Sequence, residues 1–376
     1  MEMQQFIEKL LAAAKEQGID PAEAYVNAGT NFSADVMQGS IDTYSVSDKL
    51  GLGLRGIYQG KMGYASTQAF DDEAIKQLIE GVKEGASLRE DEDVEEIYAG
   101  DASYPTVNSW SDALEQVSAT EKLDACLNIE KAAVSSQPTV TRCSGTRLST
   151  ISRETRICNS YGLNLHHRCN LYLTYTDAIA QEGDSTATAV AFQSGRDFSE
   201  VDPQALGAKA AREAAEALHG SPVPAGSYRI ILRWDAMQAL LETFCGIFSA
   251  ENAQQGMSLL NGREDEAIAA PCVTLMDDPL LPGGFSSYPF DDEGVACRTK
   301  AVVEAGVLKT LLHNRKTAKK QGIASTGNAA RMGLSAPVTV APSNLFFQPG
   351  TQSLAEMEAQ SPAASYVPLP RFLLQD

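Results

Sequence analysis

The sequence predicts an α+β fold, with mixed α/β layers and antiparallel sheets in the N-terminal part and a mostly antiparallel C-terminal domain containing a central helix. Helical and extended segments follow one another without the regular strand–helix–strand rhythm of a doubly wound parallel sheet. Turn residues separate several extended segments, as expected between neighbouring antiparallel strands. The chain has 376 residues, 43% of them hydrophobic, so it can bury a large core in two or three domains.

A helix is predicted at the N-terminus, followed by a strand. Phe6, Leu10 and Ala14 recur at helical spacing, and the apolar pattern stops at Gly18. An extended segment begins at residues 24–26. The first helix lacks the basic leading segment of a signal peptide, and no apolar run approaches the roughly 20 residues of a membrane span. We therefore expect a cytoplasmic protein with no membrane partner.

Residues 51–58 and 62–66 predict a β-hairpin in which Gly60 supplies the positive φ of a tight turn. Gly51 and Gly53 are a weak match to a phosphate-binding loop. Such a loop should leave a strand and open a helix, whereas this stretch continues as a strand. The pattern therefore favours a hairpin over a nucleotide site.

The next segments mix helices and strands. The sequence predicts, in order, a helix at 71–84, an acidic loop at 89–96, a helix at 112–134, strands at 139–148, 149–159 and 163–177, and a helix at 203–218. A turn is expected at 159–162 and a boundary in the Gly- and Pro-rich stretch 220–226. The expected domains are residues 1–105, 106–222 and 223–376.

Charge and cysteine content exclude some classes of protein. The formal net charge is −19, which disfavours binding to nucleic acid because that binding depends on clustered Lys and Arg. The seven cysteines have no C-x-x-C spacing, so we expect reduced thiols. A metal site built from this chain's own histidines is also disfavoured. His166 and His167 are neighbours in a predicted strand and should point to opposite faces, and His219 and His313 have no suitable neighbours in sequence.

A short buried strand at 228–233 and a single apolar helix at 234–261 are predicted next. The helix carries Leu240-Leu241-Glu242-Thr243, with Ile247 further along. Glu242 and Glu251 fall about 180° apart on a straight helix, so they make a poor catalytic pair. We favour a packing helix, with an acid–base role for Glu242 as the alternative.

Several phrases elsewhere in the chain occur in a characteristic order. They are Gly51-Leu-Gly-Leu-Arg55, Gly63-Tyr-Ala-Ser-Thr67, Asn159-Ser-Tyr-Gly-Leu163, Ala178-Ile-Ala-Gln-Glu-Gly183, Asp277-Asp-Pro279, residues 285–294, residues 301–308 and Ser325-Thr-Gly-Asn-Ala-Ala-Arg331. Together with the helix, these phrases resemble the TldD/PmbA family, whose members have been called modulators of DNA gyrase. The resemblance extends to about Gly350.

In metal-bearing members of that family, the helix reads His-Glu-x-x-x-His. Here Glu242, Thr243 and Ile247 occupy those three degenerate metal-site positions. The resemblance is therefore to the PmbA branch, also called TldE. It implies a subunit with no catalytic residue and no metal of its own. It also implies a heterodimer with a TldD-like subunit that carries zinc and acts on unfolded or leader peptides.

The resemblance also implies that downstream loops line a peptide cleft or face the partner subunit. The residues expected to do so are Asp291, Glu293, Gly294, Asn328 and Arg331. Gly294 ends an acidic loop, and residues 325–331 form a small-residue loop that allows close backbone approach. A purely structural role for these loops is the alternative.

Three functions follow from these residues. The first is the non-catalytic subunit of a TldD/PmbA-type metallopeptidase, and the second is a peptide-binding or scaffold protein that acts alone. The third is an independent hydrolase that uses Glu242 or the loop 291–293 as acid or base. A homodimer is also possible. Residues 361–376 do not match the family's continuation, so we expect a C-terminally truncated chain with an incomplete last domain.

Overall fold

The computed structural model describes residues 2–89, 95–220, 224–227, 230–360 and 365–367. The chain forms two compact units, each assembled from three separate stretches. Unit 1 contains residues 1–220, 279–297 and 330–338, and unit 2 contains residues 221–278, 298–329 and 339–376. Helices and antiparallel sheets build both units, so the predicted α+β class is confirmed.

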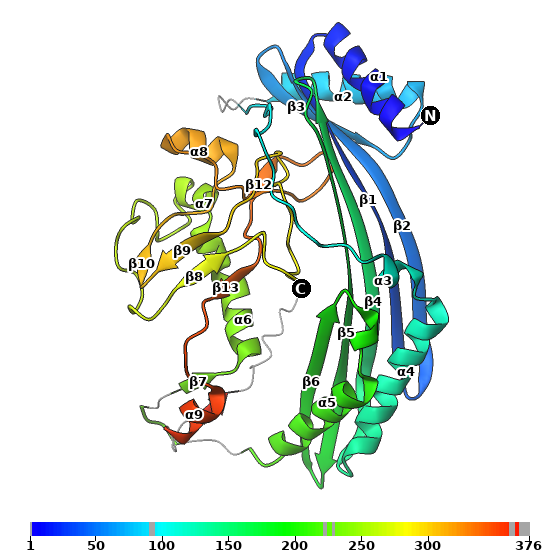
Figure 1. The fold of residues 1–376 in the computed structure, drawn as a ribbon, viewed down its shortest axis with the longest axis vertical. Helices are drawn as coiled ribbons and strands as arrows, with labels where there is room; N and C mark the ends of the chain where they lie inside the picture. The colour runs from blue at the N-terminus through cyan, green and yellow to red at the C-terminus, as the bar shows by residue number, and fades with distance from the viewer. Residues whose placement is uncertain (1, 90–94, 221–223, 228–229, 361–364, 368–376) are drawn as a thin grey trace. The chain divides into compact units, whose positions relative to one another are not determined.

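Unit 1 is built on a six-stranded antiparallel sheet with the order β3–β2–β1–β4–β5–β6 (Figure 1). The strands are β1 (Ile19–Met37), β2 (Ser40–Tyr58), β3 (Lys61–Thr67), β4 (Val140–Asn159), β5 (Asn164–Glu182) and β6 (Ser185–Gly195). This single sheet includes strands from both of the expected N-terminal domains, 1–105 and 106–222. The expected three-domain division stays a prediction.

The predicted strands 139–148 and 149–159 are one continuous strand, so that part of the prediction was wrong. β4 pairs with β1 on one side and β5 on the other, and both ladders run through Leu148 and Ser149 without a break. β6 was not predicted as a strand. Its alternation of Ala with Thr, Val and Phe is weak in hydrophobic contrast, which explains the omission.

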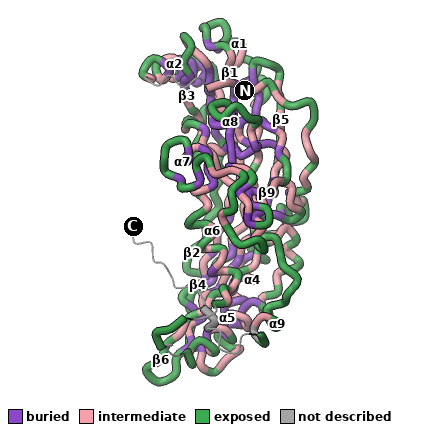
Figure 2. Tube along the Cα trace, turned by 90° about the vertical axis from the view of Figure 1, so that its left-hand side faces the viewer, coloured by how far each residue is buried: buried purple, intermediate pink, exposed green. Residues whose placement is uncertain are grey.

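The helices of unit 1 are α1 (Met3–Glu16), α2 (Asp72–Leu88), α3 (Asp112–Gln116), α4 (Ala119–Ser136) and α5 (Pro203–Ala217). Helices α1 and α2 lie toward one end of the long strands, and α4 and α5 lie toward the other end (Figure 1). α1 and α2 pack on β1, β2 and β3, whereas α4 and α5 pack on β1, β4, β5 and β6. Buried residues, purple in Figure 2, mark the sides of these elements that face one another.

The predicted helix 112–134 is two helices. Val117 adopts an extended conformation and Ser118 starts α4 with a capping box, in which Ser118 and Glu121 satisfy each other's backbone N–H groups. The Ser-x-x-Glu signature of a helix start lies inside a longer apolar pattern, and that pattern masks the boundary between the two helices. The sequence also predicts a solvated acidic loop at 89–96. Residues 90–94 of that loop lie outside the described residues.

The predicted hairpin is confirmed, with Gly60 at φ 82° between β2 and β3. Gly51 and Gly53 lie within β2, not at a phosphate loop. A Cβ atom at Gly53 would lie 2.0 Å from the carbonyl oxygen of Leu334. The glycine therefore allows the segment 330–338 to approach the strand backbone.

Unit 2 contains a four-stranded antiparallel sheet with the order β10–β9–β8–β13. The strands of this sheet are β8 (Leu275–Asp277), β9 (Lys300–Glu304), β10 (Val307–Leu308) and β13 (Leu345–Phe347). In the same unit, β7 (Ile230–Leu232) pairs with β14 (Ser365–Val367). A further pair, β11 (Ala329–Arg331) with β12 (Val338–Val340), has residues 330, 331 and 338 in unit 1 and its other residues in unit 2. The helices are α6 (Trp234–Phe244), a 3-10 turn (Cys245–Phe248), α7 (Ala250–Gln254), α8 (Arg315–Gln321) and α9 (Leu354–Ala359).

Two predictions for the start of unit 2 were wrong. The single helix 234–261 is broken at Cys245, and of the α6 residues only Ala236 is buried. The predicted strand at 228–233 is observed at Ile230–Leu232 but is not buried there, as Ile230 is 57% exposed. Residues 228–229 lie outside the described residues. In the part of the chain that the structure describes, no helix combines the length and apolarity that crossing a membrane requires.

The truncation inferred from residues 361–376 rests on residues that mostly lie outside those described.

Candidate functional site

The three positions that the resemblance matches to a His-Glu-x-x-x-His motif lie where α6 ends and the 3-10 turn begins. Glu242 and Thr243 are exposed near the end of α6, and Ile247 is half-buried within the turn. The Thr243 hydroxyl donates a hydrogen bond to the Ala239 carbonyl oxygen at 2.7 Å. One carboxylate, one committed hydroxyl and one aliphatic side chain do not make a zinc donor set. The residues present therefore do not fit the metal.

The local backbone is nevertheless distorted at this point. A spacing of five residues between two ligands does not fit a regular α-helix, so the metal-bearing pattern needs a local distortion of the helix. Here the α-helix ends at Phe244, and Cys245–Phe248 continues as a 3-10 segment. The Asn252 amide donates a hydrogen bond to the Gly246 carbonyl oxygen at 2.9 Å, which helps to hold the turn.

Histidines provide no alternative set of ligands. His166 and His167 point in opposite directions from β5, as predicted. His166 Nε2 lies 3.0 Å from a Glu154 carboxylate oxygen, whereas His167 Nε2 lies 3.1 Å from the Ser109 hydroxyl. Burial lowers the pKa of His167 to about 4. Among the residues described, no three His, Cys, Asp or Glu side chains are grouped so that they could hold a metal ion.

The remaining two histidines lie in different units. His313 is fully buried, and burial lowers the pKa of its ring. Its Nδ1 lies 3.2 Å from the Thr317 hydroxyl. His219 is exposed just after the end of α5.

Four of the five predicted loop residues belong to unit 1 and lie close together. Asp291 is buried, and one of its carboxylate oxygens accepts hydrogen bonds from the backbone N–H groups of Glu293 and Val295, each at 3.0 Å. Gly294 has φ 81°, and its carbonyl oxygen accepts a hydrogen bond from the Tyr104 hydroxyl at 2.9 Å. The acidic loop is thus shaped by its own first carboxylate and by the requirement for glycine.

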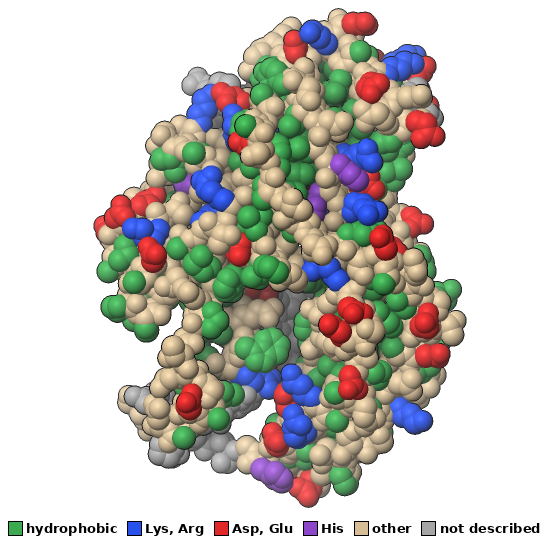
Figure 3. Space-filling view, in the orientation of Figure 1, with side chains coloured by type: hydrophobic (Ala, Val, Ile, Leu, Met, Phe, Trp, Pro, Cys, Tyr) green, Lys and Arg blue, Asp and Glu red, His purple; other side chains and the backbone are tan. Residues whose placement is uncertain are grey.

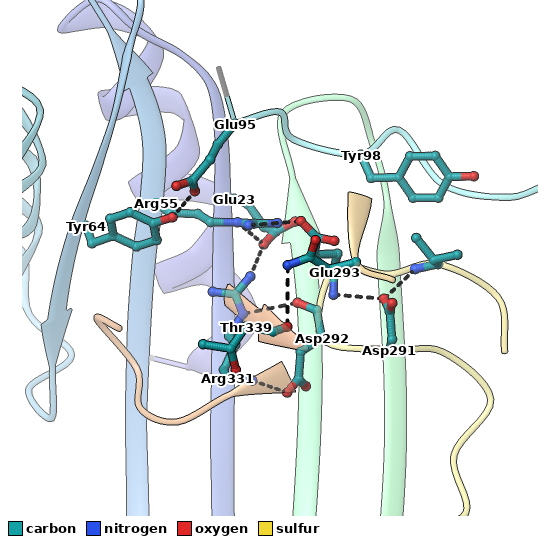
Figure 4. Close-up of polar contacts among 12 residues, drawn as sticks. Glu23, Arg55, Tyr64, Glu95, Tyr98, Asp291, Asp292, Glu293, Arg331 and Thr339 are labelled. Atoms are coloured by element: carbon teal, nitrogen blue, oxygen red, sulfur yellow. Dashed lines mark hydrogen bonds and ion pairs between the residues drawn. The ribbon is translucent and has the colours of Figure 1, made fainter. Parts of the chain in front are cut away.

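Glu293 and Arg331 enter a buried ion cluster with two residues that the sequence did not single out (Figure 4). Glu23 comes from β1 and Arg55 from β2, and the Arg55 Nε atom donates to a Glu23 carboxylate oxygen at 2.8 Å. Arg55 Nη1 lies 3.8 Å from Glu293, and Arg331 Nη2 pairs with the same Glu23 oxygen. The formal charges of these four side chains cancel. We call this group the ion cluster.

The surroundings of the ion cluster stabilise its charges. The Arg331 guanidinium stacks on Tyr25, 4.4 Å from the ring centroid, and its Nε atom donates to the Asp292 carbonyl oxygen at 3.0 Å. Burial acts to lower the pKa of Arg55, but Glu23 and Glu293 outweigh it and the pKa is raised. Burial and Asp292 raise the pKa of Tyr25. The arginines therefore stay charged and the phenol stays neutral.

Asn328, the fifth predicted residue, belongs to a separate network in unit 2. Its amide donates to an Asp277 carboxylate oxygen at 2.8 Å, and its own oxygen accepts from Lys300 at 3.1 Å. Lys300 also pairs with Asp277 at 2.8 Å. The other Asp277 oxygen accepts from the backbone and hydroxyl of Ser343. This network holds β8, β9 and the loop 325–328 together.

All five predicted loop residues are thus committed to internal contacts. Asp291 is buried and accepts backbone hydrogen bonds, Asp292 accepts from Tyr25, and Glu293 lies beside a guanidinium, so the geometry does not support acid–base work by the loop 291–293. A signal for Glu23 and Arg55 was available, because each is the one charged residue in a short apolar segment, residues 22–26 and 51–57. The sequence alone does not show that these strands are neighbours.

Charged side chains on the surface are mixed. Figure 3 shows, over one face of the described residues, Lys and Arg side chains interspersed with Asp and Glu side chains. Such a mixture does not create the continuous positive field that a nucleic-acid backbone requires.

The fold and the helix with its substituted ligand positions define a class: the scaffold of a metallopeptidase family. Family models match most of the chain. The PmbA/TldA metallopeptidase domain 1 matches residues 22–86, the central domain matches residues 112–218, and the C-terminal domain matches residues 225–368. The chain therefore belongs to the PmbA/TldD metallopeptidase family.

Individual relatives agree with this assignment. A metalloprotease of Methanocaldococcus jannaschii is 26% identical over 364 residues, which cover 93% of this chain and 77% of the relative. The metalloprotease PmbA of Escherichia coli O157:H7 is 23% identical over 325 residues, covering 85% of this chain and 71% of that protein.

Solved structures share the fold. A Thermotoga maritima protein described as a modulator of a DNA gyrase superposes with a TM-score of 0.88 at 28% identity, covering 95% of this chain and 80% of that one. TldE from Thermococcus kodakarensis superposes with a TM-score of 0.86 at 23% identity and the same coverage, a likeness of fold.

Proposed function

We propose that this chain is a PmbA/TldE-like, non-catalytic subunit of a TldD/PmbA-type metallopeptidase that takes part in proteolysis of unfolded or leader peptides. The observation that carries the proposal is the set of side chains at residues 242, 243 and 247, which does not fit a zinc site. Zinc and the catalytic carboxylate would come from a TldD-like partner in a cytoplasmic heterodimer.

The metal content of the two proteins tests the proposal. The isolated chain should contain no stoichiometric zinc, and peptide cleavage should require both this chain and a relative with an intact His-Glu-x-x-x-His motif. The matched control is a Glu242→Gln variant of this chain, which should leave the turnover of the pair unchanged. Stoichiometric zinc in the isolated chain, or cleavage of peptides by the chain alone, would overturn the proposal.

A stand-alone peptide-binding or scaffold protein is the second candidate. The backbone edge of β2 at residues 40–50 favours it, because β3 pairs only with residues 52–58 and an extended peptide could add a strand beside residues 40–50. This candidate predicts peptide affinity that is independent of any partner. Stable co-purification of a TldD-like subunit in a one-to-one ratio would contradict it.

A further inference from the structure

The β1–β2 hairpin carries a long open strand edge. β2 pairs with β1 from Ser40 to Tyr58, but β3, its other neighbour, pairs only with residues 52–58. Every residue from 40 to 50 is exposed. In the ranges that the structure describes, no strand pairs with the outward-facing backbone groups of residues 40–50. An edge of this kind is a template for pairing with another chain.

Apolar side chains of this edge share a face with buried residues of β1. Opposite residues in the register include Phe32 with Val46, Ala34 with Tyr44 and, after a bulge at Asp42, Val36 with Ile41. Opposite residues point to the same face. The three β1 residues are at most 4% exposed, whereas Ile41 is 43%, Tyr44 is 59% and Val46 is 57% exposed. The face of the sheet that is buried on β1 is therefore exposed on β2.

Helix α4 explains where the cover ends. Phe32, Ala34 and Val36 pack in one buried cluster with Cys126 of α4, and few contacts reach from α4 to β2. The other edge of the sheet differs. On β6, Ala191 is fully buried in a cluster formed with α5, so there the cover extends to the edge strand.

The hairpin is held in place before any partner binds. The buried Glu130 carboxylate of α4 accepts hydrogen bonds from the backbone N–H groups of Gln38 at 2.8 Å and Gly39 at 2.6 Å, at the tip of the hairpin. The Thr30 hydroxyl donates to Asp48 at 2.7 Å across the two strands. A preformed edge loses little conformational entropy on binding.

Two candidate occupants fit this surface less well than a folded partner subunit would. A lone extended peptide would pair with the edge but would leave the exposed apolar face uncovered. A second copy is disfavoured by long-range repulsion, because each copy carries a net charge of −19.

We propose that the open edge of β2, from Ser40 to Leu50, is the surface that binds the metal-bearing partner subunit. The partner supplies an edge strand with Lys or Arg facing Asp42 and Asp48, and an apolar element that covers Ile41, Tyr44 and Val46. This inference rests on the proposed function, because it assigns the surface through which that heterodimer forms.

The test measures association of the full chain with a relative from the same organism that carries the intact His-Glu-x-x-x-His motif. A Val46→Lys variant should raise the Kd of this association, measured by sedimentation, at least tenfold, because the new charge would be buried in the interface. The matched control is Phe192→Lys on β6, where the side chain is 43% exposed, and its Kd should stay within twofold. Thermal unfolding of the isolated variants verifies their fold.

Hydrogen exchange provides a second readout that needs no variant. The amides of residues 40–50 should gain protection in the complex. If the wild-type pair forms but Val46→Lys binds equally well, or the protected amides lie elsewhere, the edge assignment fails and the proposed function stands. If the wild-type pair does not form, both fail. Protection of residues 40–50 by self-association, or by a basic peptide alone, would also overturn the assignment.

Discussion

At the residue scale, the ion cluster shows how single charges hold distant parts of unit 1 together. Glu23 and Arg55 lie on neighbouring strands of the sheet, whereas Glu293 and Arg331 come from segments far along the chain. Each arginine is about 1% exposed at its side chain. Loss of one partner therefore leaves a buried charge without compensation, which costs more than the pair contributes.

Arg331→Ala should lower the free energy of unfolding by about 3–5 kcal/mol, because Glu23 loses a partner and Tyr25 loses the stacked guanidinium. Urea denaturation provides the measurement. The control is Arg263→Ala, which removes an exposed pair with Glu266 and should cost less than about 1 kcal/mol. Equal losses for the two variants would show that the cluster does not stabilise the fold.

The buried His167 ring should make the free energy of unfolding depend on pH. Burial lowers its pKa from 6.5 to about 4, so between these values the unfolded chain binds more protons than the folded chain. Stability from this residue is fully present above pH 6.5 and is lost as the pH falls toward 4.

A His167→Gln variant should therefore show a shallower fall of Tm between pH 6.5 and 4 than the wild type. Gln keeps a hydrogen-bonding group near Ser109 but does not titrate. His166→Gln is the control, since that ring is 40% exposed and lies beside Glu154. An unchanged slope in the His167 variant would contradict the prediction.

At the element scale, sequence patterns located most helices and strands but not their breaks or their neighbours. Amphipathic spacing predicted α1, α2 and α5, and the turn at Gly60 predicted the β2–β3 hairpin. The division of the 112–134 helix and the joining of the strands at Leu148 were missed. Both depend on competition between local signals and tertiary pairing, which a single sequence does not weigh.

Close contact between α4 and α5 depends on Gly207. A Cβ atom there would lie 2.6 Å from the Ile129 carbonyl oxygen and from the Ala133 nitrogen, both in the α4 backbone. Gly207→Ala should destabilise the protein by about 1–3 kcal/mol through overpacking, despite the better helix propensity of Ala. Urea denaturation measures the loss. Gly145→Ala on β4 is the control, because nothing lies within 4 Å of its added Cβ, and its change should be near zero.

At the scale of the whole molecule, the candidate site was only partly predictable. The sequence singled out Asp291, Glu293 and Arg331 through the family phrases, but not Glu23 or Arg55. Their meeting depends on a topology in which residues 279–297 and 330–338 join the unit formed by the first 220 residues. Such long-range pairing leaves no local periodicity in the sequence. The loss of metal ligands at positions 242, 243 and 247 could be predicted from the sequence, because the identity of a side chain alone decides whether it suits a zinc site.

Each unit has its own core and its own buried ion pair, which predicts a local response to mutation. Arg331→Ala should speed hydrogen exchange first in β1 and β2, whereas Lys300→Met should speed it first in β8 and β9, where Asp277 loses its cation. Exchange measured by mass spectrometry on the full chain distinguishes the two patterns. Lys309→Met is the control, because its pair with Asp265 is exposed. If both buried variants instead sped exchange in all four strands equally, the two units would open as one.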